Sequence, residues 1–414
     1  WGAESIGTAW LDDPRTIFPL KLLAVGMPFA VVSACIKGYY YAVGKLFRPT
    51  SAQAAELVVQ FLIIINIIDY FMQGGPEYAC AAIAVGTTIS ELASCLFSLT
   101  LYWAELRNND PGLSPPHQQR NILKKLLYIS FPVSVSSLIR TSLKMLENIM
   151  VPIGFEKFGY SRKVSLEQYG KLHGMVMPIL MFPSSVIIAF SALLIPEISE
   201  ANALNQKKKV EYSILRSLQL TCIMSVLVSG VFLFFSNSLG IVIYDSGECG
   251  ALMKRLAPLI PLIYLDIVVD ELLKALNQQV SVLRYNMLDA TMKIVLIYYV
   301  LPVKGLDGLI FVLYAGGLFN TTISIRKLLK TTRLHFKAAE WIFKPILSVA
   351  ASGIIAVFLL DAAGKSRLTD ILYLSSGAAL TCIFYFFFLF KLGCLTREDT
   401  RWFRSIFRQN VKSG

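Results

Sequence analysis

The sequence predicts an all-α polytopic membrane protein, a helix bundle of about eleven transmembrane segments. Hydrophobic residues make up 55% of its 414 residues and charged residues only 16%, against about 25% charged in soluble domains. The mean hydropathy is +0.59. Many apolar runs approach the roughly 20 residues that a helix needs to cross a bilayer. Such runs are too long and too numerous for one buried core, so we expect lipid to be the solvent.

The predicted spans follow one another with short polar connections. They cover residues 19–44, 52–73, 78–104, 124–152, 170–195, 212–236, 256–276, 284–302, 306–327, 343–362 and 369–391. An internal proline frees a backbone carbonyl and permits a kink, and such prolines occur at Pro28, Pro132, Pro178, Pro183, Pro258 and Pro261. After the last span, residues 395–411 alternate apolar side chains with arginines. This pattern fits either an amphipathic helix on an anionic inner leaflet or a frayed tail.

The distribution of basic residues predicts an orientation. A net charge of +12 would suggest a nucleic-acid ligand in a soluble protein, but in a membrane protein Lys and Arg collect in cytoplasmic loops. One alternate set of predicted loops, which includes 207–209, 326–344 and the C-terminal tail, carries about twice as many basic residues as the other. We therefore expect the N-terminus outside and the C-terminus in the cytoplasm, with the loop at 154–169 as the weakest fit. An odd number of spans then indicates a miscount or spans that precede Trp1.

The sequence lacks the usual signals of metal, cofactor or enzyme sites. Seven cysteines are scattered without a CxxC pair, and three histidines form no metal-binding pattern. Gly364-Lys365-Ser366 ends like a phosphate-binding loop, but Leu359 stands where that loop needs its first glycine. HExxH and GxSxG motifs are missing. We expect no resident metal, no cofactor and no enzymatic activity.

Ionisable residues are unevenly distributed among the spans, and charges at bilayer depth normally face a bundle interior or a wet cavity. Arg140, Lys144 and Glu147 lie at i, i+4 and i+7, on one face of one helix. Glu147 can neutralise Lys144, which leaves Arg140 for an anion, and arginine binds phosphate through a bidentate fork. One interpretation is a headgroup site for an anionic, pyrophosphate-bearing lipid. The other is that Glu56 or Glu91 on neighbouring helices pairs these bases purely to hold the bundle together.

Acidic residues cluster in the seventh and eighth predicted spans. Asp270/Lys274 and Asp289/Lys293 are i, i+4 pairs with the acid first, the favourable order for an intrahelical ion pair. A structural role is the stronger interpretation for both pairs. Asp266 has Asp270 at i+4 and therefore no such basic partner. Asp266 is the preferred candidate for a ligand of a coupling cation, with Asp270 as the second.

Two groups of residues resemble the stage V sporulation protein B family. The first is Cys35-Ile36-Lys37-Gly38-Tyr39-Tyr40-Tyr41-Ala42, followed by Arg48-Pro49-Thr50 and Gln53-Ala54-Ala55-Glu56. The second is Gln168-Tyr169-Gly170, Pro183-Ser184, Ala192 to Ala201, Leu256-Ala257-Pro258 and Ala275-Leu276-Asn277-Gln278. The resemblance extends from about Asp12 to about Lys391, with Lys37 and Ala42 standing where the family has Arg and Gln.

This resemblance implies a place in the multidrug/oligosaccharidyl-lipid/polysaccharide exporter superfamily, to which the lipid II flippases are related. The implied fold is a two-lobed, MATE-like exporter with a peripheral pair of C-terminal helices. On that plan the chain lacks about three N-terminal helices. Residues 1–120 are then the rest of the N-lobe, 121–335 the C-lobe, and 336–414 the peripheral pair with the basic tail.

The resemblance also implies a function, which is a cell-membrane flippase or exporter for a lipid-linked saccharide, a cell-wall or spore-cortex precursor, working by alternating access. The implied partners are that substrate, membrane lipids and H⁺ or Na⁺ as coupling ion, with no nucleic acid. The candidate cavity residues are Arg140, Lys144, Glu147, Lys37, Glu56 and Glu91. Three alternatives stay open: a drug/cation antiporter of the same superfamily, a non-transporting membrane scaffold in sporulation, and a membrane-embedded glycosyltransferase, for which the loops are short.

Overall fold

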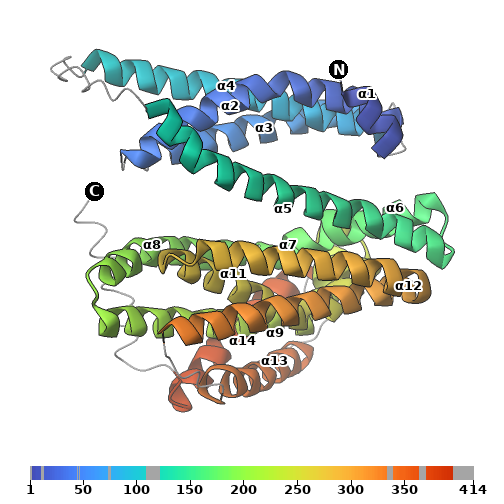
Figure 1. Ribbon diagram of the computed structural model, residues 1–414. Helices are drawn as coiled ribbons and strands as arrows, with labels where there is room; N and C mark the ends of the chain where they lie inside the picture. Colours follow the sequence, from blue (N-terminus) through green and yellow to red (C-terminus); the bar gives the residue numbers. More distant parts are fainter. Residues whose placement is uncertain are drawn as a thin grey trace. The chain divides into compact units, whose positions relative to one another are not determined.

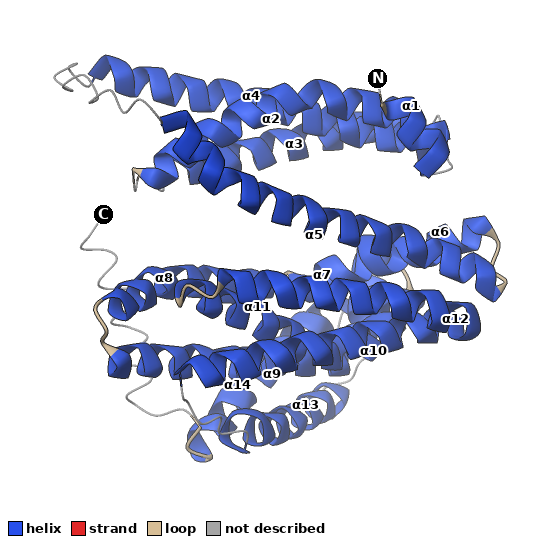
Figure 2. Ribbon diagram, viewed as in Figure 1, coloured by secondary structure: helices blue, strands red, loops and turns tan. Residues whose placement is uncertain are grey.

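The computed structural model describes residues 2–10, 14–43, 45, 47–72, 76–108, 122–332, 339–362 and 370–394. Every regular element in these residues is a helix, and none is a strand (Figure 1, Figure 2). The chain divides into two compact units, Trp1–Leu126 and Leu127–Gly414, here called unit 1 and unit 2. The tail predicted to be amphipathic, 395–411, lies outside the described residues.

The described part of unit 1 consists mainly of three long helices that match the first three predicted spans. They are α2 (Ile17–Ala42), α3 (Phe47–Met72) and α4 (Pro76–Asn108), preceded by α1 (Ala3–Ser5), a π-helical turn (Ile6–Trp10) and a 3-10 turn (Pro14–Thr16). Both α2 and α3 pack along α4. Ala81 and Ala82 on α4 are fully buried, and small residues of this kind let membrane helices approach closely.

Unit 2 begins within α5 (Ile122–Phe158) and holds the rest of the chain. The other helices are α6 (Arg162–Gly170), α7 (Met177–Met181), α8 (Ser184–Ala203), α9 (Lys207–Tyr244), α10 (Gly247–Leu256), α11 (Ile260–Ala275), α12 (Gln279–Thr332), α13 (Lys344–Ala362) and α14 (Asp370–Lys391). Two π-helical turns (Lys171–Val176, Ala339–Phe343) and a 3-10 turn (Ala257–Leu259) adjoin them. Packing around α9 organises this unit, because α8, α10, α11, α13 and α14 all contact it.

Each predicted span overlaps a helix among the described residues. Seven helices among the described residues are long and apolar enough to cross a membrane, and α12 contains two of the predicted spans. The break between these two lies at Gly305, whose φ of 53° and ψ of −129° are not helical. A positive φ favours glycine, and a Cβ at this position would lie 2.9 Å from the ring of Phe158. The span predicted at 170–195 is divided into shorter helices near Pro178 and Pro183.

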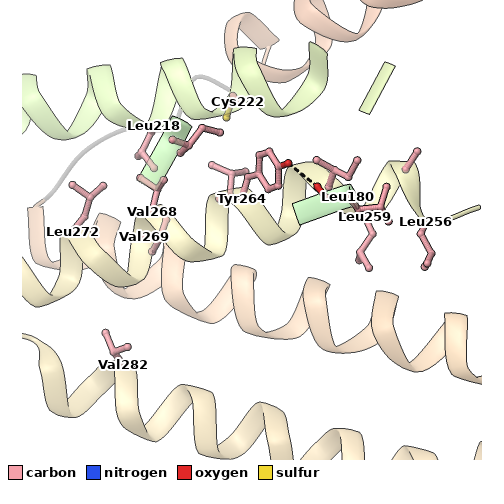
Figure 3. Close-up of a cluster of buried hydrophobic side chains, with 14 of the residues drawn as sticks. Leu180, Leu218, Cys222, Leu256, Leu259, Tyr264, Val268, Val269, Leu272 and Val282 are labelled. Atoms are coloured by element: carbon pink, nitrogen blue, oxygen red, sulfur yellow. Dashed lines mark hydrogen bonds between the residues drawn. The ribbon is translucent and has the colours of Figure 1, made fainter. Parts of the chain in front are cut away.

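In the core of unit 2, side-chain hydroxyls donate hydrogen bonds to backbone carbonyls near the prolines that interrupt helices. The hydroxyl of Tyr264 donates a 2.7 Å hydrogen bond to the carbonyl of Leu180, three residues before Pro183 (Figure 3). Ser229 on α9 likewise donates to the carbonyl of Ala257, next to Pro258, at 2.8 Å. In hydrocarbon an unsatisfied backbone group costs several kcal/mol, so a broken helix needs such donors. The breaks therefore lie against α9 and α11, inside the unit.

Candidate functional site

Several ionisable residues in the described part of unit 1 form ion pairs with one another. Lys37 on α2 forms an ion pair with Glu56 on α3, with its Nζ 2.9 Å from Oε2. Glu56 therefore has a basic partner within unit 1. Glu91, on α4, lies partly buried against the backbone of α2, and Glu56 is its electrostatic neighbour.

A second ionic cluster holds the ends of the three helices of unit 1 together. The buried carboxylate of Glu105, near the end of α4, binds both Lys45 and Arg48. The guanidinium of Arg48 also lies over the ring of Tyr40, 5.1 Å from its centroid. Lys37, Tyr40, Arg48 and Glu56 all belong to the first group of residues on which the family resemblance was based. That group therefore encodes ion pairs among α2, α3 and α4.

Unit 2 contains a cavity of about 860 Å³ that the charged face of α5 lines. The opposite side is formed by α11 and both parts of α12, and the segment around Met177 contributes as well. Six charged residues line the cavity: Arg140, Lys144 and Glu147 from α5, Asp270 from α11, and Asp289 and Lys293 from α12. Three of these are basic and three acidic, so the formal charges balance.

The α5 side of the cavity presents charges without ionic partners. Arg140 and Lys144 are exposed, and Glu147 is half-buried. Among the described residues, none of the three forms an ion pair or a hydrogen bond. Glu147 is an electrostatic neighbour of Lys144 but does not pair with it directly. All three side chains line one cavity, as their shared helix face would place them, and the two bases are exposed.

Of the two ion pairs predicted on α11 and α12, Asp270/Lys274 does not form and Asp289/Lys293 does. Lys274 binds Glu271 at 2.7 Å instead of Asp270, because the i, i+3 carboxylate lies closer to its ammonium. Asp270 instead accepts a hydrogen bond from the amide of Asn286 at 2.9 Å. The pair Asp289/Lys293 forms as expected, with Oδ2 and Nζ 2.6 Å apart.

A chain of amide hydrogen bonds connects Asp266 to this cavity. The Nδ2 group of Asn320 donates to both carboxylate oxygens of Asp266, at 3.0 and 2.9 Å. The same group lies 3.1 Å from Oδ1 of Asn286, whose own amide binds Asp270. Asp266 and Asp270 are thus linked through two asparagines, and neither forms an ion pair among the described residues. Buried oxygens of Asp270, Asp289 and Asn320 have no hydrogen-bond partner there.

The two asparagines are among the site residues that the sequence argument missed. Asn320 begins an Asn-Thr-Thr sequon inside a predicted span, where glycosylation is excluded. An amide at that depth is itself a signal, because a polar side chain inside a bilayer helix needs a partner on another helix. Asn286 lies three residues before Asp289 on α12, on the same helix face. For metal binding, no group of three His, Cys, Asp or Glu side chains with suitable spacing occurs among the described residues.

Long apolar helices and a charged cavity between them define a multi-pass integral membrane protein of the helix-bundle type. The chain is homologous to two proteins of Bacillus subtilis (strain 168). It is 26% identical over 344 residues to stage V sporulation protein B, which covers 82% of this chain and 66% of that protein. It is 22% identical over 261 residues to sporulation protein YkvU, covering 62% and 58% of the two chains. The chain thus spans less than two thirds of the length of either relative. No family model matches it.

Solved structures agree on the fold. The lipid II flippase MurJ, in an inward closed conformation, is similar with a TM-score of 0.61 at 14% identity, over 90% of this chain and 74% of MurJ. An inward-facing multidrug resistance MATE family transporter of the MOP superfamily is similar with a TM-score of 0.59 at 16% identity, over 77% and 72% of the two chains. The predicted all-α, MATE-like membrane fold is confirmed, and so is the resemblance to stage V sporulation protein B.

Proposed function

We propose that this chain belongs to a flippase or exporter that moves a lipid-linked saccharide, a cell-wall or spore-cortex precursor, across the cell membrane by alternating access. The observation that carries the proposal is the unit 2 cavity, which presents Arg140 and Lys144 without ionic partners among the described residues. A fold shared with a lipid II flippase and with multidrug transporters supports it. So does the homology to two sporulation proteins.

In this proposal the two bases of α5 bind the phosphates of the lipid headgroup. A guanidinium offers a planar fork that fits two phosphate oxygens, and an ammonium adds a second point charge. The volume of about 860 Å³ falls within the range of small-molecule sites, so a headgroup fits while its polyprenyl tail stays in lipid. Glu147 then faces the sugar, whose hydroxyls can donate hydrogen bonds to a carboxylate. In unit 1, the candidate substrate-binding residues are Lys37, Glu56 and Glu91.

A coupling cation, H⁺ or Na⁺, binds at Asp266 and Asp270 in this mechanism. The direct hydrogen-bond partners of both carboxylates among the described residues are amides, and neither carboxylate forms an ion pair there. Carboxylate oxygens are hard ligands that suit hard cations. The proposed topology places the N-terminus outside and the C-terminus in the cytoplasm. The proposed lobes are 1–120 and 121–335, with residues 336–414 at the periphery.

The test is a translocation assay with the chain reconstituted in liposomes. A fluorescent disaccharide linked to a polyprenyl pyrophosphate is added, and its transfer between leaflets is followed by a membrane-impermeant quencher. Arg140→Ala and Lys144→Ala each lower the rate about tenfold or more, since a lost charge-assisted contact is worth about 1.5–3 kcal/mol. Arg284→Ala, at an exposed arginine away from the cavity, leaves the rate unchanged. Equal rates for all four proteins would reject the proposal.

The acidic cluster favours one alternative, a drug/cation antiporter. Asp266 and Asp270, lacking a basic partner among the described residues, would suit a cationic substrate as well as a coupling ion. Dye-efflux assays with a lipophilic cation separate the two functions. An antiporter loses efflux in Asp266→Asn and keeps it in Arg140→Ala. A lipid-linked saccharide flippase shows no cation efflux in either protein.

A further inference from the structure

Lys293 is a lysine held inside the cavity of unit 2. Its ammonium lies 2.6 Å from Oδ2 of Asp289, one turn earlier on α12. The side chains are 20% and 10% exposed, respectively. A lysine near the end of a membrane helix normally extends its ammonium to the interface. Lys293 instead keeps its charge among the residues that line the cavity.

The backbone of the second part of α12 fixes this position. Gly316 packs against the aliphatic stem of Lys293, and a Cβ there would overlap with Cε of the lysine. The same Cβ would lie 2.9 Å from Oδ1 of Asp289. Glycine therefore makes the space that the ion pair occupies. Any larger residue at 316 would displace the ammonium.

The ammonium has more acidic neighbours than the one it contacts. Glu147 on α5 interacts electrostatically with both Lys293 and Asp289, and Asp266 on α11 does the same. Oδ1 of Asp289 is buried without a hydrogen-bond partner among the described residues. The Lys293 ammonium thus lies near three carboxylates, and it contacts only one of the two oxygens of Asp289.

We propose that the Lys293 ammonium is a tethered cation that occupies a monovalent-cation site formed by Asp289 and Glu147. A buried carboxylate needs a compensating charge, and removing its partner leaves a strongly unfavourable state. Because Lys293 supplies that charge covalently, Asp289 binds no free cation in this protein. Replacing Lys293 by a neutral residue opens the site to Na⁺ or K⁺. Asp266 and Asp270 differ, since their partners are amides.

The experiment measures cation-dependent thermal stability of the purified chain in detergent, with NaCl, KCl or choline chloride at constant ionic strength. For Lys293→Met, we expect the midpoint temperature of unfolding to be roughly 2–4 °C higher in saturating Na⁺ or K⁺ than in choline, because a ligand that binds only the folded state stabilises it. Asp289→Asn/Lys293→Met loses this gain, because the carboxylate is gone. The matched control is Lys274→Met, whose lysine pairs with Glu271 at 2.7 Å but is 43% exposed; it gains no cation response.

Each outcome decides the proposal, and none depends on transport. A Lys293→Met protein as indifferent to Na⁺ and K⁺ as the unaltered chain overturns it. So does an unaltered chain whose cation response disappears in Asp289→Asn, because Asp289 would then already bind a free ion. Lys293→Met could fail to fold in all three salts while Asp289→Asn/Lys293→Met folds. In that case the carboxylate cannot take a free cation and the proposal is wrong. Recovery of Lys293→Met only when Na⁺ or K⁺ is present supports it.

Discussion

Unit 1 and unit 2 both carry ionisable side chains within long apolar helices, but the partners of these side chains differ. In unit 1, Lys37 binds Glu56, and Glu105 binds Lys45 and Arg48. In unit 2, Arg140 and Lys144 face a cavity and pair with no acid among the described residues. A charge inside a membrane is expensive, so a paired charge is explained by the pair. An unpaired charge at a cavity points to a ligand.

The Glu105 cluster provides the largest expected effect. Glu105→Gln leaves Lys45 and Arg48 facing each other without their carboxylate, and we expect the free energy of unfolding to fall by about 2–4 kcal/mol, somewhat below a fully buried pair. Thermal or denaturant unfolding of the purified chain measures it. Glu4→Gln is the control, because Glu4 pairs with Lys21 at 2.7 Å on a surface where both are exposed. A change as small as that of Glu4→Gln would show that the cluster is not structural.

The Lys37–Glu56 pair is the second test of the same contrast. Both side chains are about a quarter exposed, so Lys37→Met alone should destabilise by about 1–2 kcal/mol. Lys37→Met/Glu56→Leu should recover most of that loss, because it removes both charges. A double-mutant cycle on unfolding gives the coupling energy. If the double variant is no more stable than the single one, Glu56 has a partner other than Lys37.

The sequence could predict the features of the fold and the site that depend on residues close together in the chain, and it could not predict contacts between distant residues. Apolar runs and the i, i+4, i+7 spacing are local, and they located the helices and placed Arg140, Lys144 and Glu147 at one cavity. The choice of Glu271 over Asp270 by Lys274 depends on side-chain rotamers within one helix turn. The link from Asp266 to Asn320 joins residues 54 positions apart. No periodicity reports a contact of that range, so Asn320 and Asn286 could not be placed beside the acids.

Unlike the ion pairs of unit 1, the two bases of α5 are expected to contribute little to the free energy of unfolding. Arg140→Met and Lys144→Met should change the free energy of unfolding by about 0.5 kcal/mol or less, the usual size for surface positions without a specific contact. The measurement is the same unfolding experiment, read beside the translocation rate. Stability close to that of the unaltered chain together with lost transport separates a ligand-binding role from a structural one. A loss comparable with that of Lys37→Met would mean that the bases hold the bundle together.

The smallest effect is expected at the end of α6, where Lys171 binds one carboxylate of α6 and one of α10. Its ammonium binds Glu167 at 2.8 Å and Glu248 at 2.7 Å, and the hydrogen bond and charge of Lys171 lower the pKa of Glu167. A carboxylate whose pKa is lower in the folded state adds stability above its unfolded pKa, about 4.3, and loses it as pH falls through the folded value. The difference in melting temperature between the chain and Glu167→Gln should therefore be small at pH 7 and vanish toward pH 3. Glu200→Gln is the control, because exposed Glu200 forms no ion pair among the described residues. A difference that persists at pH 3 would show that Glu167 acts through packing and not through its charge.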